Sequence, residues 1–318
     1  MLPAARFHIF WLSFFIICAC SQKPKDKDPG RPAFVFISTC VNEDFFKPVK
    51  KGMNDAAALL DVNCTFIGTP GVDAKAQAHM VDSAIDSGAD GIAVNIIDSV
   101  AFDEVIAKAI AKGIPVVAFN SDDNYTDNKR LSSVCQDLYM AGLQFGKSIE
   151  KDIAQGSTVI ITVHSDGISA LEERVKGIKE ALGKKDLKFT GVVTTNIIDS
   201  ATKNIAAALE KNPGVKAILY TGLADTEGAG NVIENYHLQN DVIAAGFDLS
   251  GKILDHVEKG NLLFTIDQQP YMQGFLPVVQ LAHYKKYGIL PSSNHIGASF
   301  VTKQNVSEVK HLTAKGYR

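Results

Sequence analysis

A regular alternation of short apolar runs with amphipathic stretches, which begins at residue 33, constrains the fold most strongly. Runs rich in β-branched residues, such as AFVFISTC (33–40) and IPVVAFN (114–120), predict strands. The stretches between them place apolar residues three or four positions apart, which predicts helices with one buried face. Strands that are apolar on both faces need helices on both sides of a parallel sheet. The sequence therefore predicts an α/β protein.

The alternation occurs twice, before and after a polar interruption at 120–137 that contains a further short strand, LSSVCQ. Strands are expected at 33–40, 63–68, 90–96 and 114–120, and then at 157–163, 187–193, 215–221, 241–247 and 262–267. So many strands exceed what one open sheet usually holds, and two doubly wound parallel sheets are the favoured architecture. A closed (β/α)8 barrel is the alternative, although the strands outnumber the eight that it needs.

The N-terminal residues predict export. An apolar run from Ile9 to Ala19 follows Arg6 and is too short to span a bilayer, so residues 1–20 are typical of a signal peptide. The ending ICAC resembles the bacterial lipobox, which implies that Cys20 is lipidated; an ordinary cleaved signal is the alternative. The charged, proline-containing segment 21–32 predicts a solvated tether. We therefore expect an exported lipoprotein that is held at a membrane by the lipid on Cys20 alone.

Composition argues against several classes of partner. The chain has 318 residues, with 32 Lys and Arg against 35 Asp and Glu, so no basic excess favours nucleic acid. Three cysteines follow the predicted signal, and an odd number cannot form a complete disulfide framework. We expect Cys40, Cys64 and Cys135 to be small buried residues. No His or Cys residues have zinc-site spacing, and neither a metal nor a cofactor is expected.

Motifs for catalysis are also missing from the sequence. His164, Ser165 and Asp166 have the residue types of a triad, but sequence neighbours point apart and a triad is assembled from separate segments. The acidic loop that begins at Asp122 lacks the spacing of a calcium loop, so a solvated loop is the better interpretation. We expect a protein that is not an enzyme.

Polar and aromatic residues follow the predicted strands. In open α/β sheets a ligand binds beyond the carboxyl ends of the strands, so these residues are candidate ligand contacts. They are Asn42, Glu43, Phe45, Phe46, Asn95, Asn120, Asp122, Asp225, Asp248 and Gln268. Amides and carboxylates bind hydroxyl groups, and aromatic faces cover the C–H face of a sugar ring. The set predicts a polyhydroxylated ligand.

Six segments together resemble the periplasmic sugar-binding proteins of ABC importers, of the ribose and galactose type that shares its fold with the ligand-binding core of LacI-type repressors. They are FISTCVNEDFFKPVKKGMNDAA (36–57), DGIAVNIID (90–98), GIPVVAFNSDD (113–123), ISALEERVKGIKEAL (168–182), AAGFD (244–248) and TIDQQPYMQG (265–274). The resemblance covers residues 33–300. It implies two lobes joined by three crossovers, one lobe being 33–135 plus 268–297 and the other 136–267 plus 298–318.

The resemblance also implies roles for particular residues. It assigns ring stacking to Phe45 and Phe46, and polar ligand contacts to Asn120, Arg174, Asp248 and Gln268. The planar guanidinium of Arg174 has five donors and can hold two sugar oxygens at once. A solvated helix charge beside Glu172 and Glu173 is the alternative interpretation of Arg174.

Two departures from the ribose-binding members argue against ribose as the ligand. The pair Asn120-Ser121 stands where those relatives have a carboxylate followed by Arg, and the loop 196–200 has no aromatic residue. Another monosaccharide, a polyol or a sugar-like signal stays open. The expected function is solute capture for an ABC permease by a monomeric receptor. A sensory module that presents its bound ligand to a chemoreceptor or a histidine-kinase ectodomain is the alternative.

Overall fold

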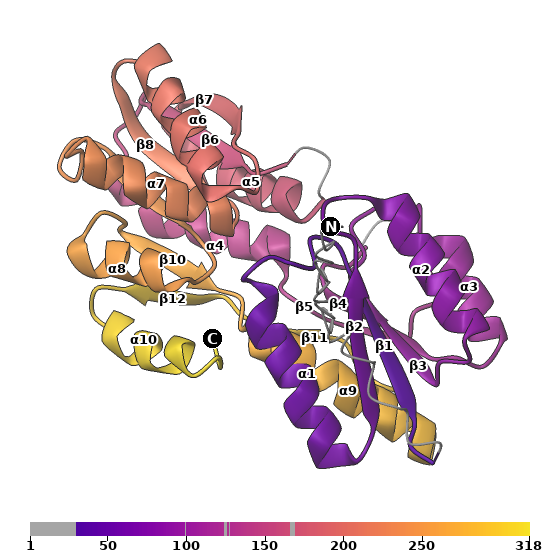
Figure 1. The fold of residues 1–318 in the computed structure, drawn as a ribbon. Coiled ribbons are helices and arrows are strands. Elements are labelled where there is room, and N and C mark those ends of the chain that lie inside the picture. The colour runs from indigo at the N-terminus through magenta and orange to yellow at the C-terminus, as the bar shows by residue number, and fades with distance from the viewer. Residues whose placement is uncertain (1–29, 99, 124–125, 127, 166–168) are drawn as a thin grey trace, which may run out of the picture.

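The computed structural model describes residues 30–98, 100–123, 126, 128–165 and 169–318. These residues form two lobes, each built on a six-stranded sheet that lies between helices (Figure 1). The predicted fold class is therefore confirmed, and the alternative of a single closed barrel is wrong, because each sheet is open with two free edges. The predicted signal with Cys20 and most of the predicted tether lie outside the described residues.

The first sheet has the strand order β11-β5-β4-β3-β1-β2, and its recorded strand pairs are all parallel. Its strands are β1 (Ala33–Ser38), β2 (Asn63–Gly68), β3 (Gly91–Val94), β4 (Val116–Asn120), β5 (Ser132–Cys135) and β11 (Asn294–His295). Helices α1 (Phe46–Leu60) and α9 (Pro270–Tyr287) bury one face, and α2 (Ala74–Asp86) and α3 (Asp103–Ala111) bury the other.

The second sheet has the order β12-β10-β9-β8-β6-β7, in which only β12 runs antiparallel to its neighbour. Its strands are β6 (Thr158–Val163), β7 (Lys188–Val193), β8 (Val215–Tyr220), β9 (Ile243–Phe247), β10 (Phe264–Asp267) and β12 (Ser299–Thr302). One face is covered by α4 (Leu138–Ile149) and α5 (Ser169–Leu182). The other is covered by α6 (Ile198–Lys211), α7 (Leu223–Asn235), α8 (Gly251–Lys259) and α10 (Val306–Ala314). Short 3₁₀ turns follow α4 (Glu150–Asp152) and α5 (Gly183–Lys185).

Local sequence explains where these elements begin and end. The Asp73 carboxylate accepts the N–H of Ala76 at 2.9 Å and caps α2, and the Ser250 hydroxyl caps α8 through the N–H of Ile253 at 3.1 Å. In α1 the buried residues Val49, Met53 and Ala56 recur at helical spacing, as the amphipathic pattern predicts.

The chain passes between the two sheets three times, after β5, after β10 and after β11. Helix α9 thus returns to the first lobe and lies beside α1, although the two are far apart in sequence (Figure 1). The crossovers contact one another: the Gln136 amide donates to the carbonyl of Gly297, and Gly297 lies against the backbone of Gln268. A Cβ on Gly297 would lie 2.3 Å from that backbone, so a residue without a side chain is required there.

Four elements were not among those predicted from the sequence, namely α4, α10, β11 and β12. The two strands are short, at two and four residues, and β11 is exposed, so neither forms the long apolar run by which the other strands were found. Among the described residues, no helix combines the length and the hydropathy needed to cross a membrane.

Candidate functional site

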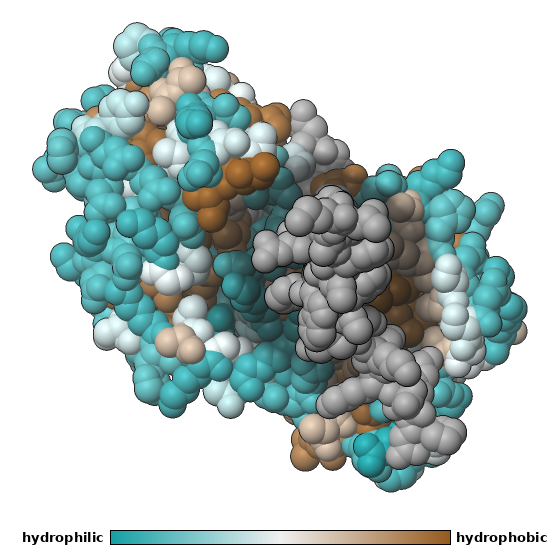
Figure 2. Space-filling model, viewed as in Figure 1, coloured by the Kyte–Doolittle hydropathy of each residue, from teal (hydrophilic) through white to brown (hydrophobic). Residues whose placement is uncertain are grey.

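A cavity of about 390 Å³ lies between the lobes at the carboxyl ends of both sheets. The hollow between the lobes is lined with hydrophilic residues where it is visible in Figure 2. Nine of the eleven predicted contacts line it: Asn42, Glu43, Phe45, Phe46, Asn95, Asn120, Arg174, Asp248 and Gln268. Other lining residues include Cys40, Ser121, His164, Asn196, Glu227 and Ser250. The structure therefore brings together residues that are dispersed over most of the sequence.

Phe45 and Phe46 form the aromatic part of the cavity wall at the start of α1. Their ring centroids are 5.1 Å apart with an interplanar angle of 87°, and Phe46 packs in turn on Phe66 at 5.7 Å. Both residues are at least nine-tenths buried within the core of the first lobe. The pair is a rigid apolar surface against which a ring could pack.

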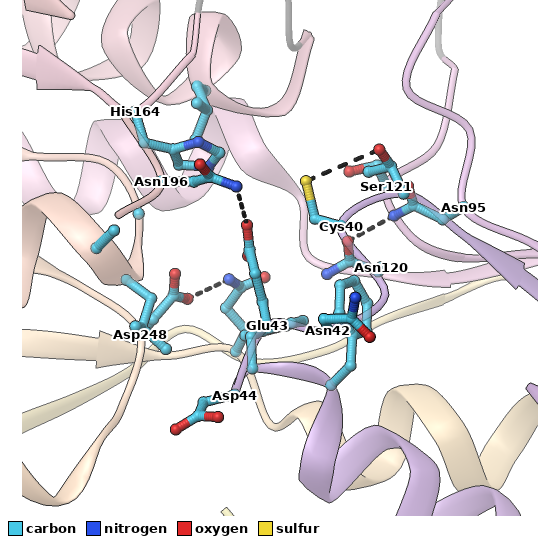
Figure 3. Close-up of a pocket in the computed structure, with 18 of the residues that line it drawn as sticks. Cys40, Asn42, Glu43, Asp44, Asn95, Asn120, Ser121, His164, Asn196 and Asp248 are labelled. Atoms are coloured by element: carbon cyan, nitrogen blue, oxygen red, sulfur yellow. Dashed lines mark hydrogen bonds between the residues drawn. The ribbon is translucent and has the colours of Figure 1, made fainter. Parts of the chain in front are cut away.

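Amide side chains form a continuous network beneath the cavity. Asn95 donates to Asn120 Oδ1 at 2.6 Å, and Asn120 donates to Gln273 Oε1 at 3.0 Å (Figure 3). Gln273 donates to the carbonyl of Gln268 at 3.1 Å, so the network reaches the crossover after β10. Asn120 has a left-handed backbone conformation with φ 65°, which Asn tolerates better than most residues. Among the described residues the buried Asn95 Oδ1 has no donor, which leaves it available to a ligand hydroxyl.

Arg174 is buried in the second lobe, so its interpretation as a solvated helix charge does not hold. Its Nη1 donates to the carbonyl of Thr221 at 2.6 Å, and its guanidinium stacks over the ring of Phe247 at 4.3 Å. Close packing of two helices sets its place, because a Cβ on Gly142 of α4 would lie 2.3 Å from the Arg174 carbonyl oxygen. Gln136, in the first crossover, accepts hydrogen bonds from Nε and Nη2 on another edge of the guanidinium.

Asp248 follows β9 and faces the same part of the cavity. Burial raises the pKa of its carboxyl, while the nearby positive charge of Arg174 and a hydrogen bond from Gln268 oppose that increase. Arg174, whose Nη1 and Nη2 each keep one N–H beyond these protein contacts, thus lies beside an acceptor, the carboxylate of Asp248, and the pair can bind hydroxyl groups.

Glu43 and Asn196 connect the lobes directly across the cavity. The Asn196 amide, in the loop after β7, donates to Glu43 Oε1 at 3.1 Å (Figure 3). Burial raises the pKa of Glu43, opposed by hydrogen bonds from Asn196 and from the Cys40 thiol. Cys40 is free and buried, as predicted, but it also lines the cavity, and burial together with the charge of Glu43 raises its pKa to about 12.

His164 lines the cavity from the end of β6. Burial and the charge of Arg174 lower its pKa to about 4, so the ring is neutral at physiological pH. A neutral imidazole can both donate and accept a hydrogen bond. His164 contacts Ser165 through Nδ1 at 3.2 Å, whereas Asp166 lies outside the described residues.

Two predicted contacts lie away from the cavity wall. Asp122 turns back into its own lobe and accepts from Arg130 Nη2 at 2.8 Å. Asp225 is fully buried at the start of α7, where it accepts the N–H groups of Thr221 and Gly222 at 3.1 and 2.9 Å. Both follow strand ends as the cavity-lining residues do, but their carboxylates satisfy local donors, a contact that spacing in sequence does not reveal. Burial raises the pKa of Asp225 to about 7.

Several residues at the site were not among the predicted contacts, and Asn196, Gln136 and Gln273 are three that bind other cavity residues. Asn196 follows β7, so the rule for strand ends would have included it. Gln136 and Gln273 bind other cavity residues rather than line the cavity, and no sequence pattern singles them out. Among the described residues, no group of three or more His, Cys, Asp or Glu side chains is arranged to hold a metal ion.

Comparison with known proteins identifies the family. The family model for the periplasmic binding protein domain matches residues 34–288. This chain belongs to the periplasmic binding protein family. It is 31% identical over 306 residues to the xylose/arabinose-binding protein XylF of Sulfolobus acidocaldarius, covering 91% of this chain and 75% of XylF. It is 26% identical to the ribose import binding protein RbsB of Bacillus subtilis, covering 84% of this chain and 88% of RbsB.

Solved structures with a similar fold agree with this assignment. A carbohydrate transporter from Acidothermus cellulolyticus, in complex with myo-inositol, superposes with a TM-score of 0.79 at 27% identity, covering 91% of this chain and all of that one. The XylFII molecule superposes with a TM-score of 0.81 at 23% identity, which shows a common fold. The predicted resemblance to periplasmic sugar-binding proteins is confirmed, as is the prediction that the chain is not an enzyme.

Proposed function

We propose that this periplasmic binding protein captures a pentose or a related small polyol between its lobes and delivers it to an ABC permease. The cavity carries the proposal: Arg174 and Asp248 face it from the second lobe, and Phe45, Phe46 and Asn120 face it from the first. A ligand that contacts both sets stabilises the closed form, because those contacts form together only when the lobes meet.

The relatives narrow the class of ligand. Proteins named for xylose, arabinose, ribose and allose are among them, and all of these are neutral monosaccharides. XylF, the relative at 31% identity, is named for xylose and arabinose, so aldopentoses are the first ligands to test. Ribose is a weaker candidate, since Asn120-Ser121 replaces a charged pair at the end of β4. The sensory alternative is less favoured, because curated relatives are named as import binding proteins.

Binding can be tested by the melting temperature of residues 31–318 in the presence of D-xylose, L-arabinose, D-ribose, D-allose or myo-inositol. A ligand at 100 times its dissociation constant adds about 2.7 kcal/mol to the free energy of unfolding, which raises the melting temperature measurably. A specific increase with one sugar supports the proposal and names its ligand. No increase with any of the five would contradict a monosaccharide or polyol ligand.

We also propose that the mature chain begins at a lipidated Cys20 and acts as a monomer tethered by residues 21–32. We further propose that the first lobe comprises residues 33–135 and 268–297, and that the second lobe comprises residues 136–267 and 298–318. Replacement of Cys20 by Ser should move the protein from the membrane to the soluble fraction of the producing bacterium, because the lipid would be its only anchor. The matched control, Cys18→Ser, should leave it at the membrane. Equal fractionation of both variants would contradict lipid anchoring at Cys20.

A further inference from the structure

The segment that follows α10 crosses from the second lobe to the first. Helix α10 belongs to the second lobe, where Val306 and Val309 enter its core. The ring of Tyr317 instead packs on Tyr271 of α9, with centroids 5.2 Å apart, and lies 4.7 Å from the ammonium group of Lys51 in α1. Figure 1 shows this end of the chain between α10 and α1. The segment therefore connects the lobes beside the three covalent crossovers.

Arg318 in this segment pairs with a buried carboxylate at the crossover after β10. Its guanidinium contacts Asp267, whose side chain is 0% exposed, whereas Arg318 itself is 27% exposed. The other oxygen of Asp267 accepts the N–H of Gln269 at 2.7 Å. Gln269 has a left-handed conformation, with φ 53°, and precedes Pro270 at the start of α9. Asp267 thus holds the left-handed turn at Gln269 in place, and the positive charge of Arg318 compensates the buried negative charge of Asp267.

The turn leads directly to the ligand cavity. Gln268, which lies between Asp267 and Gln269 in the chain, lines the cavity and donates to the carboxylate of Asp248. Its carbonyl accepts from Gln273, which binds Asn120 in turn. Arg318 does not line this cavity. It lines a smaller one of about 260 Å³, and five residues line both cavities: Asp44, Phe45, Asp248, Ser250 and Gln268.

We propose that Arg318 is a positioning residue for the ligand site, which holds the crossover so that Gln268 and Asp248 face the cavity. A buried carboxylate that loses its cation must take up a proton or admit water. Either change weakens the hydrogen bond that the N–H of Gln269 donates to the carboxylate of Asp267. A displaced turn would move Gln268, which lines the cavity, so the loss of Arg318 would alter the ligand site although Arg318 does not line it.

The test compares Arg318→Met, the double variant Arg318→Met with Asp267→Asn, and the control Lys310→Met. Lys310 also forms ion pairs from α10, at 2.6 Å to Asp255 and 2.5 Å to Glu258, but these lie away from the crossover. Hydrogen exchange of residues 264–275 measures the crossover without any ligand. Titration with D-xylose, L-arabinose and myo-inositol measures the site, and melting curves establish that each variant folds.

Arg318→Met should speed exchange of the Gln269 N–H, which Asp267 accepts, and weaken sugar binding about fivefold or more. The double variant should recover much of both losses, since a neutral amide at 267 needs no cation but still accepts the N–H of Gln269. Lys310→Met should change neither. Unchanged exchange in Arg318→Met, or a loss that the double variant does not relieve, would overturn the proposal. The affinity part rests on the proposed function; if no sugar binds the wild type, that function fails while exchange still decides the role of Arg318.

Discussion

Gln136 Oε1 accepts two hydrogen bonds from Arg174, at 2.8 Å from Nη2 and 3.2 Å from Nε. Gln136 lies in the first crossover, and its amide nitrogen donates to Gly297 in the third. Arg174, which lines the cavity between the lobes, is therefore attached through Gln136 to two of the three crossovers. The position of the guanidinium and the geometry of the crossovers depend on each other.

Replacing Gln136 by Met should weaken sugar binding, although Gln136 does not line the cavity. The variant keeps the length of the side chain but removes the acceptor for two charged donors, a loss of about 1.5–3 kcal/mol. Isothermal titration with the preferred sugar measures the change. Gln144→Met on the exposed face of α4 is the control and should bind normally. Equal affinity of the two variants would argue against a role for Gln136 in orienting Arg174.

Replacing Arg174 by Ala should reduce affinity by about 2–5 kcal/mol, because truncation leaves Asp248 buried beside the ligand without its cation. Arg174→Lys should recover only part of the loss, since an ammonium group cannot reproduce the planar fork. Titration of both variants separates charge from geometry. A loss of binding free energy below about 0.5 kcal/mol in Arg174→Ala would contradict a ligand contact by Arg174.

Replacing Phe45 by Leu should weaken binding of a ring sugar by about 0.5–1.5 kcal/mol, because an aliphatic side chain fills the site without the aromatic face. Leu is chosen rather than Ala because Phe45 is buried and a cavity would destabilise the lobe. Phe66→Leu, in the same aromatic cluster but away from the cavity wall, is the matched control. If both variants bind like the wild type, stacking on Phe45 does not contribute.

Sugar affinity should decrease as the pH falls through the raised pKa of Glu43. A hydroxyl that donates to the carboxylate favours the ionised form, so binding is retained above this pKa and is lost below it. Glu43→Gln should bind more weakly at neutral pH and show a flatter profile. Affinity measured across the weakly acidic range tests this. Parallel profiles for the two proteins would assign the pH dependence to another group.

The architecture was predictable from the sequence because parallel strands covered on both faces form apolar runs such as GIAV at 91–94, fully buried here. The rule for strand ends found eight of the residues that line the cavity, including Asn95 and Asn120, because the carboxyl ends of parallel strands meet at one edge of a sheet. It could not separate Asp225 from Asp248, because both follow buried strands and differ only in which donors they meet. The search for apolar runs did not find β12 either, because this strand forms by antiparallel pairing with β10, a tertiary contact.

Two helices that are distant in sequence, α1 and α9, meet through glycines, and this has a consequence for the order of folding. A Cβ on Gly274 would lie 1.9 Å from the carbonyl of Val49, so the helices fit together only at full backbone contact. The first lobe completes its core only when α9 returns after the long segment 136–269, whereas in the second lobe only the shorter segment 268–298 separates β10 from β12. Because closing long loops is slow, we expect the second lobe to acquire structure first. Hydrogen exchange during refolding should then protect β6, β8 and β9 before α9.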